Sequence, residues 1–98
     1  MSSEYTIENR ITELIEYTVD PQKKFTEFEE ITGIKKQTWA NITHGKQRAN
    51  SDTLEAIGKK WPQYAYWIMT GETDEKNGHT SPILEKIQRD LKRAKKAS

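Results

Sequence analysis

The chain has 98 residues, enough for one compact domain with a short appendage. Hydrophobic residues make up 33% and charged residues 32%, so the core must be small, yet 9% aromatic residues are too many for a disordered chain. Cysteine is absent, which excludes disulfides and thiolate metal sites and fits a reducing cytosol. No segment resembles a signal peptide or approaches the ~20 apolar residues that span a bilayer. A cytoplasmic protein without membrane contact is expected.

Charge is distributed unevenly, although the formal net charge is only +1. Residues 1–30 contain three basic and eight acidic residues, a net charge of −5, whereas residues 31–60 contain six basic and two acidic residues, a net charge of +4. Residues 61–81 return to −2, and residues 82–98 to +4. The central basic block is the kind of surface that attracts a phosphate backbone. The alternative is that the excess charge only solvates the surface.

The first predicted element is an amphipathic helix over residues 4–19, because apolar residues recur there at helical spacing, namely Ile7, Ile11, Leu14 and Ile15. Ser2 or Ser3 is available as its N-cap. Asp20 should end the helix, since the residue before a proline avoids the α region.

A short second helix is predicted over Thr26–Thr32, with Thr26 and Glu29 at the spacing of a capping box. Its inward side consists of three aromatic and aliphatic residues, Phe25, Phe28 and Ile31. Gly33 follows at once and suits the left-handed position that closes a helix. A third helix is predicted over Lys36–Thr43, buried through Trp39 and Ile42 and followed by a basic turn, His44-Gly45-Lys46-Gln47-Arg48.

A fourth helix should begin near Ser51 or Asp52, with Asp52 and Glu55 as a capping box and a buried stripe formed by Leu54, Ile57 and Trp61. Pro62 is tolerated in a first helical turn, so a fifth helix is predicted from Pro62 to Met69. Its inward side would be Tyr64, Trp67 and Ile68. Both tryptophans and the tyrosine are interpreted as core residues rather than as a ligand cage.

Residues 72–81 are polar and are interpreted as a linker between a domain of residues 1–71 and a basic amphipathic helix of residues 82–98. Ser81 would cap that last helix. Its apolar seam has the spacing of a coiled-coil edge, in Leu84, Ile87, Leu91 and Ala94. The predicted fold is all-α, a compact bundle of about five helices with a helix-turn-helix, plus the C-terminal helix.

Two short helices joined by a turn at Gly33, with a further helix behind them, form a helix-turn-helix. If Trp39 and Ile42 bury one edge of the second of these helices, four residues are left outward, namely Lys36, Gln37, Ala40 and Asn41. Glutamine and asparagine can bond bidentately to adenine, and lysine can donate to guanine. For an arbitrary helix the same residues would be a solvated face.

The segment from Phe25 to Gly71 resembles the Cro/C1-type (XRE-like) helix-turn-helix family of phage and bacterial regulators. The matching positions are Phe28, Gly33-Ile34, Trp39, Ile42, Gly45-Lys46, Arg48, Leu54 and Ile57. The stretch Trp67-Ile68-Met69-Thr70-Gly71 is similar to the "W-L-x-T-G" ending of many phage-repressor-like proteins. The resemblance covers about half of the chain and implies a DNA-binding repressor or other transcription regulator.

In this family, outward residues of the second helix read bases and the following loop contacts phosphates. The resemblance therefore implies base reading by Lys36, Gln37, Asn41 and Ala40, and phosphate contact by Thr38, Lys46, Gln47 and Arg48. The sequence departs from the family pattern twice. Glu29 stands where a small residue, usually alanine, is preferred, and Ala49 stands where proline is common. The first departure predicts looser or shifted packing between the two helices, and the second predicts a loop whose geometry differs from that of the family.

The expected partners are double-stranded DNA and a second copy of the chain, paired through the helix at Ile83–Ala94 or the helix at Ile7–Ile15. The alternative is a protein-interaction module, such as an antitoxin-like adaptor, because a fold does not guarantee its usual function. Neither an enzyme nor a cofactor is expected, since no nucleophile with a base and no glycine-rich phosphate loop is present. His44 and His79 lack metal-ligand spacing.

Overall fold

The computed structural model describes residues 5–97, with side chains for residues 5–94. It confirms the all-α fold. Six α-helices follow one another along the chain: α1 (Ile7–Thr18), α2 (Lys24–Thr32), α3 (Lys36–Thr43), α4 (Ser51–Lys60), α5 (Pro62–Thr70) and α6 (Pro82–Ala97). A 3₁₀ turn, η1 (Glu75–Asn77), lies between α5 and α6. Over residues 5–97 the only β-type pairing is an isolated bridge, Asp74–His79.

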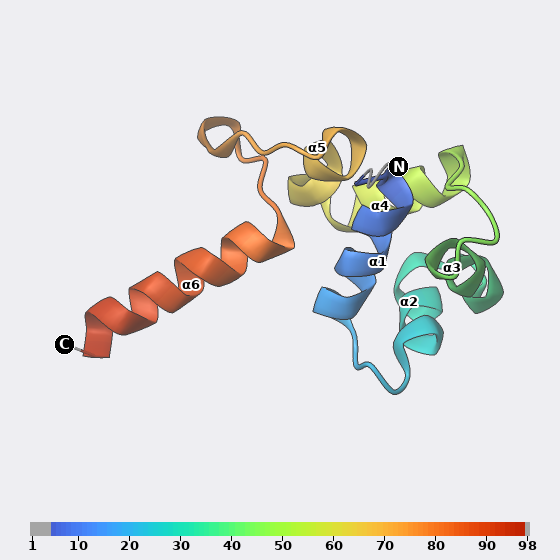
Figure 1. The fold of residues 1–98 in the computed structure, drawn as a ribbon, viewed down its shortest axis with the longest axis horizontal. Coiled ribbons are helices and arrows are strands. Elements are labelled where there is room, and N and C mark those ends of the chain that lie inside the picture. The colour runs from blue at the N-terminus through green and yellow to red at the C-terminus, as the bar shows by residue number, and fades with distance from the viewer. Residues whose placement is uncertain (1–4, 98) are drawn as a thin grey trace.

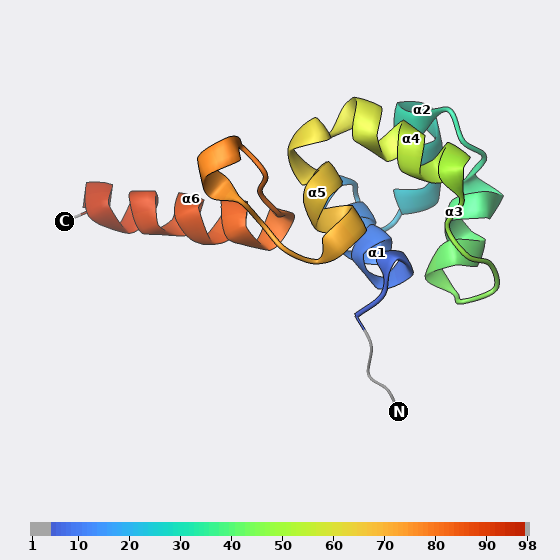
Figure 2. The same ribbon diagram turned by 90° about the horizontal axis from the view of Figure 1, so that it is seen from above.

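Helices α1 to α5 pack into one globule, and α6 extends away from it (Figure 1). Seen from above, α2 and α3 lie together at the end of the molecule opposite to the free end of α6 (Figure 2). The molecule is accordingly elongated, with principal extents of 46 × 29 × 29 Å. No helix within residues 5–97 is long and apolar enough to cross a bilayer.

The core contains the apolar residues that helical spacing assigned to it. Trp39, Phe28, Ile11 and Leu14 are wholly buried, and all five helices of the globule contribute to one cluster, completed by Ile15, Val19, Ile42, Ile57, Tyr64, Trp67 and Ile68. Five further residues that were assigned to the inward sides of helices are only partly buried and pack on the edge of this cluster, namely Ile7, Phe25, Ile31, Leu54 and Trp61. Helices this short depend on such packing, since they are marginal in isolation.

Helices α1 and α4 are capped by residues other than the predicted ones. Thr6 caps α1 in a capping box with Asn9, and the predicted caps Ser2 and Ser3 lie outside the described residues. Asn50 caps α4 in a capping box with Thr53, so the expected box of Asp52 and Glu55 is wrong. In both helices the true box starts just before the first helical residue, because the cap side chain must reach the third backbone N–H.

Helix α2 begins at Lys24, two residues before the predicted start. Thr26 therefore lies inside the helix and caps nothing, and its expected capping box with Glu29 is wrong. The end of the helix is as predicted, because Gly33 adopts a left-handed conformation with φ 78°. That conformation turns the chain sharply into α3, and a residue with a Cβ would be strained there.

The polar segment of residues 72–81 is folded back on α5. The Asp74–His79 bridge closes it around η1, and the Thr80 amide donates to the Gln63 carbonyl over 2.9 Å. Ser81 caps α6 as predicted, since its hydroxyl accepts from the Leu84 amide at 3.1 Å. The first turn of α6 is thereby attached to the globule.

Candidate nucleic-acid interface

The orientation of α3 about its own axis is fixed by two buried side chains. Trp39 is 0% exposed and Ile42 is 1% exposed. The Trp39 ring meets Phe28 edge to face at 4.8 Å between centroids, and its Nε1 donates to Thr32 Oγ1 over 3.0 Å. Because α3 cannot rotate without breaking these contacts, the opposite side of the helix must face solvent.

The four predicted base-reading residues do lie together on that solvent side. Lys36 and Gln37 are exposed, and Ala40 and Asn41 are partly exposed. Gln37 Nε2 donates to Asn41 Oδ1 over 3.0 Å, and Asn41 Nδ2 donates to Gln47 Oε1 over 3.2 Å. Gln37 and Asn41 of the helix and Gln47 of the following loop therefore form one hydrogen-bonded line of amide side chains, the amide line.

The basic loop after α3 folds back onto the end of that helix. The amides of Lys46 and Gln47 both donate to the Asn41 carbonyl, at 2.8 and 3.3 Å. Lys46 and Arg48 are exposed, so two cationic side chains stand beside the amide line. Thr38, the remaining predicted phosphate contact, lies at the border of the buried edge and lines a shallow hollow together with Gln47.

A carboxylate on α1 holds the far end of this loop. Glu8 Oε2 accepts from the Ala49 amide over 2.8 Å and lies 3.6 Å from Arg48 Nε. Burial by itself would raise the pKa of Glu8, but the Ala49 amide, a further backbone bond and Arg48 outweigh it and hold this pKa below its usual value. Proline, which is common at this position in the regulators that the sequence resembles, has no N–H and could not donate to Glu8.

The second departure, Glu29, also bonds to backbone. Its Oε1 accepts from the amide of Lys36, the first residue of α3, over 3.0 Å. The side chain of Lys35, the N-cap residue of α3, makes no capping hydrogen bond. Glu29 is thus a cap supplied by the neighbouring helix, and its negative charge is favourable at the positive end of α3. A small residue here would leave that amide without this partner.

Acid should weaken the bond between Glu8 and the loop. Because the pKa of Glu8 is lowered in the folded state, its stabilisation is fully present above the usual value of 4.5 and is lost as pH falls through the folded-state value. We expect Glu8→Gln to cost about 1 kcal/mol at neutral pH, the difference between a charge-assisted and a neutral hydrogen bond. Urea unfolding of both proteins across the acid range should show this difference shrink below pH 4.5.

Glu16→Gln is the matched control, because Glu16 is exposed on the same helix. That change should alter the free energy of unfolding by less than about 0.5 kcal/mol. An unchanging difference between wild type and Glu8→Gln from neutral to acid pH would contradict the assigned role of Glu8.

Sequence reasoning did not find the partner of either carboxylate. Glu29 was named only as half of a capping box and as a departure from the resembled pattern, and no local pattern links Glu8 to Ala49, 41 residues later. His44 is exposed, and its ring meets Phe25 edge to face at 6.0 Å, which leaves its imidazole at the rim of the loop. The described residues contain no cluster of histidine, aspartate and glutamate that could hold a metal ion.

No family model matches the sequence, and neither does any curated protein at a significant level. Solved structures do match. One is Pf6r from the filamentous phage Pf6 of Pseudomonas aeruginosa PA01, with a TM-score of 0.65 and 22% sequence identity. The match covers 81% of this chain and 97% of Pf6r. The two proteins therefore share a fold.

Proposed function

We propose that this protein binds double-stranded DNA sequence-specifically, as a transcription regulator, with α3 in the major groove. The observation that carries the proposal is the combination of one buried and one free edge on a short helix. Trp39 and Ile42 hold the buried edge, while the amide line of Gln37, Asn41 and Gln47 lies on the free one. A groove about 12 Å wide admits such a helix.

The chemistry of the free edge suits base recognition. Asparagine and glutamine match the donor and acceptor pair of adenine, and Lys36 can donate to guanine. Lys46 and Arg48 stand where the sugar-phosphate backbone would flank the groove, and Ala40 is small enough to allow close approach to a thymine methyl. Phosphate contacts would supply affinity and the amides would supply specificity.

The likeness in fold to a protein of a filamentous phage supports a phage or bacterial setting for the proposed regulator. The resemblance of Phe25–Gly71 to Cro/C1-type regulators supports the same setting, and DNA binding would place the protein in the cytoplasm. The competing proposal is a protein-interaction module on this scaffold, favoured by the exposed apolar side of α6. The two differ in their response to salt.

Binding to duplex DNA should weaken steeply between ~50 and ~200 mM salt, because each Lys or Arg contact releases counterions from phosphates. Arg48→Ala should weaken binding to all sequences similarly and reduce the slope of log K against log salt by about 1. Fluorescence anisotropy with labelled duplexes at several salt concentrations measures both. Selection from a random duplex pool then identifies the preferred sequence.

Lys60→Ala is the control, because Lys60 is an exposed lysine at the far end of α4 from the loop. It should leave the slope unchanged. Salt-independent binding, or a selected pool no different from the starting pool, would contradict the proposal and favour a protein partner.

A further inference from the structure

Helix α6 carries an apolar stripe that the rest of the chain leaves uncovered. Ile83, Ile87 and Leu91 are 55%, 50% and 61% exposed. Residues four apart lie on one side of a helix, so the three form a single stripe along α6. Ala94, also exposed, continues it. A stripe of branched apolar side chains on a helix that extends into solvent is typical of an interface.

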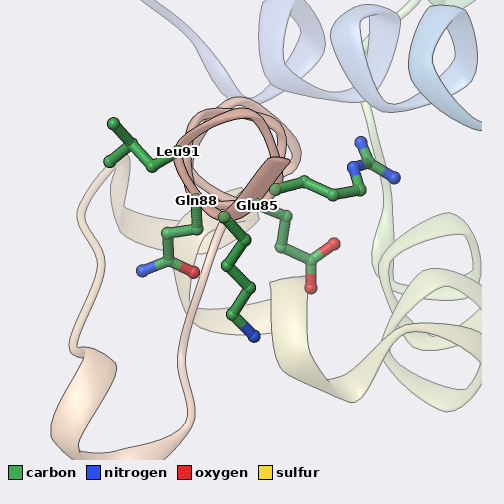
Figure 3. A pocket seen from close by; sticks show the side chains of 5 residues that line it. Glu85, Gln88 and Leu91 are labelled. Carbon is green, nitrogen blue, oxygen red and sulfur yellow. The ribbon is translucent and has the colours of Figure 1, made fainter. Parts of the chain in front are cut away.

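The opposite side of α6 is already bonded to the globule. Arg89 Nη2 donates to Tyr17 Oη over 2.7 Å, and the Tyr64 hydroxyl donates to Glu85 Oε1. Gln88 Nε2 donates to Glu75 Oε2 over 2.9 Å. Seen along α6, Leu91 and Glu85 point to different sides of the helix (Figure 3). Rolling α6 to bury the stripe against its own globule would break these bonds.

The hollow beside α6 is not a ligand pocket. Its volume is about 460 Å³, but every residue that lines it comes from α6 itself, namely Glu85, Gln88, Arg89, Leu91 and Lys92. The other helix that sequence reasoning offered for self-association is unavailable, because Ile11, Leu14 and Ile15 of α1 are at most 1% exposed. Of the two helices considered for self-association, α6 is therefore the one whose apolar residues are accessible to a partner.

We propose that the partner is a second copy of this chain, with the two α6 helices packed antiparallel about a two-fold axis near Ile87. Such an interface is self-complementary. Ile83 of one copy would then meet the partner's Leu91.

Charge favours the antiparallel arrangement. Lys86 and Asp90 flank the stripe on the same side, so antiparallel packing brings Lys86 of one copy towards the partner's Asp90, and symmetry repeats the pair. Parallel packing would instead set this side of one helix against the other side of its partner's stripe, so that Lys86 and Asp90 of the two copies would not meet.

The pairing gives the proposed regulator two copies of α3, and in this respect it rests on the proposed function. A single module reads only a few base pairs, and two on half-sites about one helical turn apart read more. When two copies are bound to neighbouring half-sites, the effective concentration of one α6 helix near the other is high. The α6 contact can therefore be weak in free solution and still order the pair on DNA.

Disulfide trapping tests the arrangement, because the chain has no cysteine. Mild oxidation of Ile87→Cys should give a covalent dimer, since the two sulfurs would meet at the axis. Ile83→Cys and Leu91→Cys should cross-link poorly alone but well when mixed. Lys92→Cys, exposed on the side opposite the stripe, is the control and should stay monomeric.

Sedimentation of the full chain without DNA tests the α6 dimer separately from the proposed DNA binding. Wild type should form a dimer, and Leu91→Glu should raise the dissociation constant at least tenfold without changing the circular dichroism spectrum, because Leu91 is exposed. A monomer at all concentrations up to ~1 mM would overturn the pairing. Equal cross-linking of all four cysteine variants would overturn the pairing too. So would binding of the chain to anionic lipid vesicles if the chain does not form a dimer. None of these results depends on DNA binding.

Discussion

Replacing Trp39 with alanine is expected to cost about 3–5 kcal/mol of the free energy of unfolding. The side chain is wholly buried, contacts Phe28 edge to face and donates a hydrogen bond to Thr32. Alanine would leave a cavity between α2 and α3 and would remove the hydrogen bond between the indole and the Thr32 hydroxyl. A domain of this size has only about 5–15 kcal/mol in total, so the variant should be largely unfolded at moderate urea concentration.

Urea unfolding followed by far-UV circular dichroism measures this loss. Met69→Ala is the matched control, because Met69 is 54% exposed and its truncation should change stability by no more than about 0.5 kcal/mol. Thr32→Val keeps the indole but removes its acceptor, and it should cost about 1–2 kcal/mol, a loss that includes the hydroxyl's bonds to the Phe28 carbonyl and the Ile34 amide. A loss below about 1 kcal/mol for Trp39→Ala would mean that α3 is not fixed by this residue.

Sequence patterns located helix α3 because the evidence for it is local. The bounds Lys36–Thr43, the buried pair Trp39 and Ile42, and the left-handed turn at Gly33 all follow from spacing and from glycine chemistry over a few residues. The same reasoning failed at the caps. Several polar residues near each helix start satisfy the capping-box spacing, and only the exact start of the helix decides between them.

Contacts between distant segments were out of reach of the sequence. Glu8 holds Ala49, Glu29 holds the first amide of α3, and the buried Arg10 donates to the Ile68 carbonyl at 2.9 Å, 58 residues away. Each is a charged side chain on an amphipathic helix, and spacing alone marks such a residue as solvated. Glu29 and Ala49 did give a signal, because each differs from the residue that is common at its position in the regulators that the sequence resembles, whereas nothing marked Arg10.

Asn41→Ala should have the largest effect on sequence preference, costing about 1–3 kcal/mol on the preferred duplex. Its side chain stands between Gln37 and Gln47, so its removal deletes one reading group and releases the two beside it. Gln37→Ala should cost a similar amount but release only one neighbour. Binding profiles over a random-sequence duplex library, compared with wild type, measure both changes.

The amide line also makes a prediction about coupling. If Gln37 and Asn41 read DNA as one unit, the double variant should lose less than the sum of the single losses, with an interaction of about 0.5–3 kcal/mol. Independent readers would give additive losses. Lys46→Ala is the contrast, because Lys46 is an exposed cation outside the line and should weaken all sequences alike. Unchanged profiles for both Gln37→Ala and Asn41→Ala would show that α3 does not read bases through this face, whatever the salt dependence of binding.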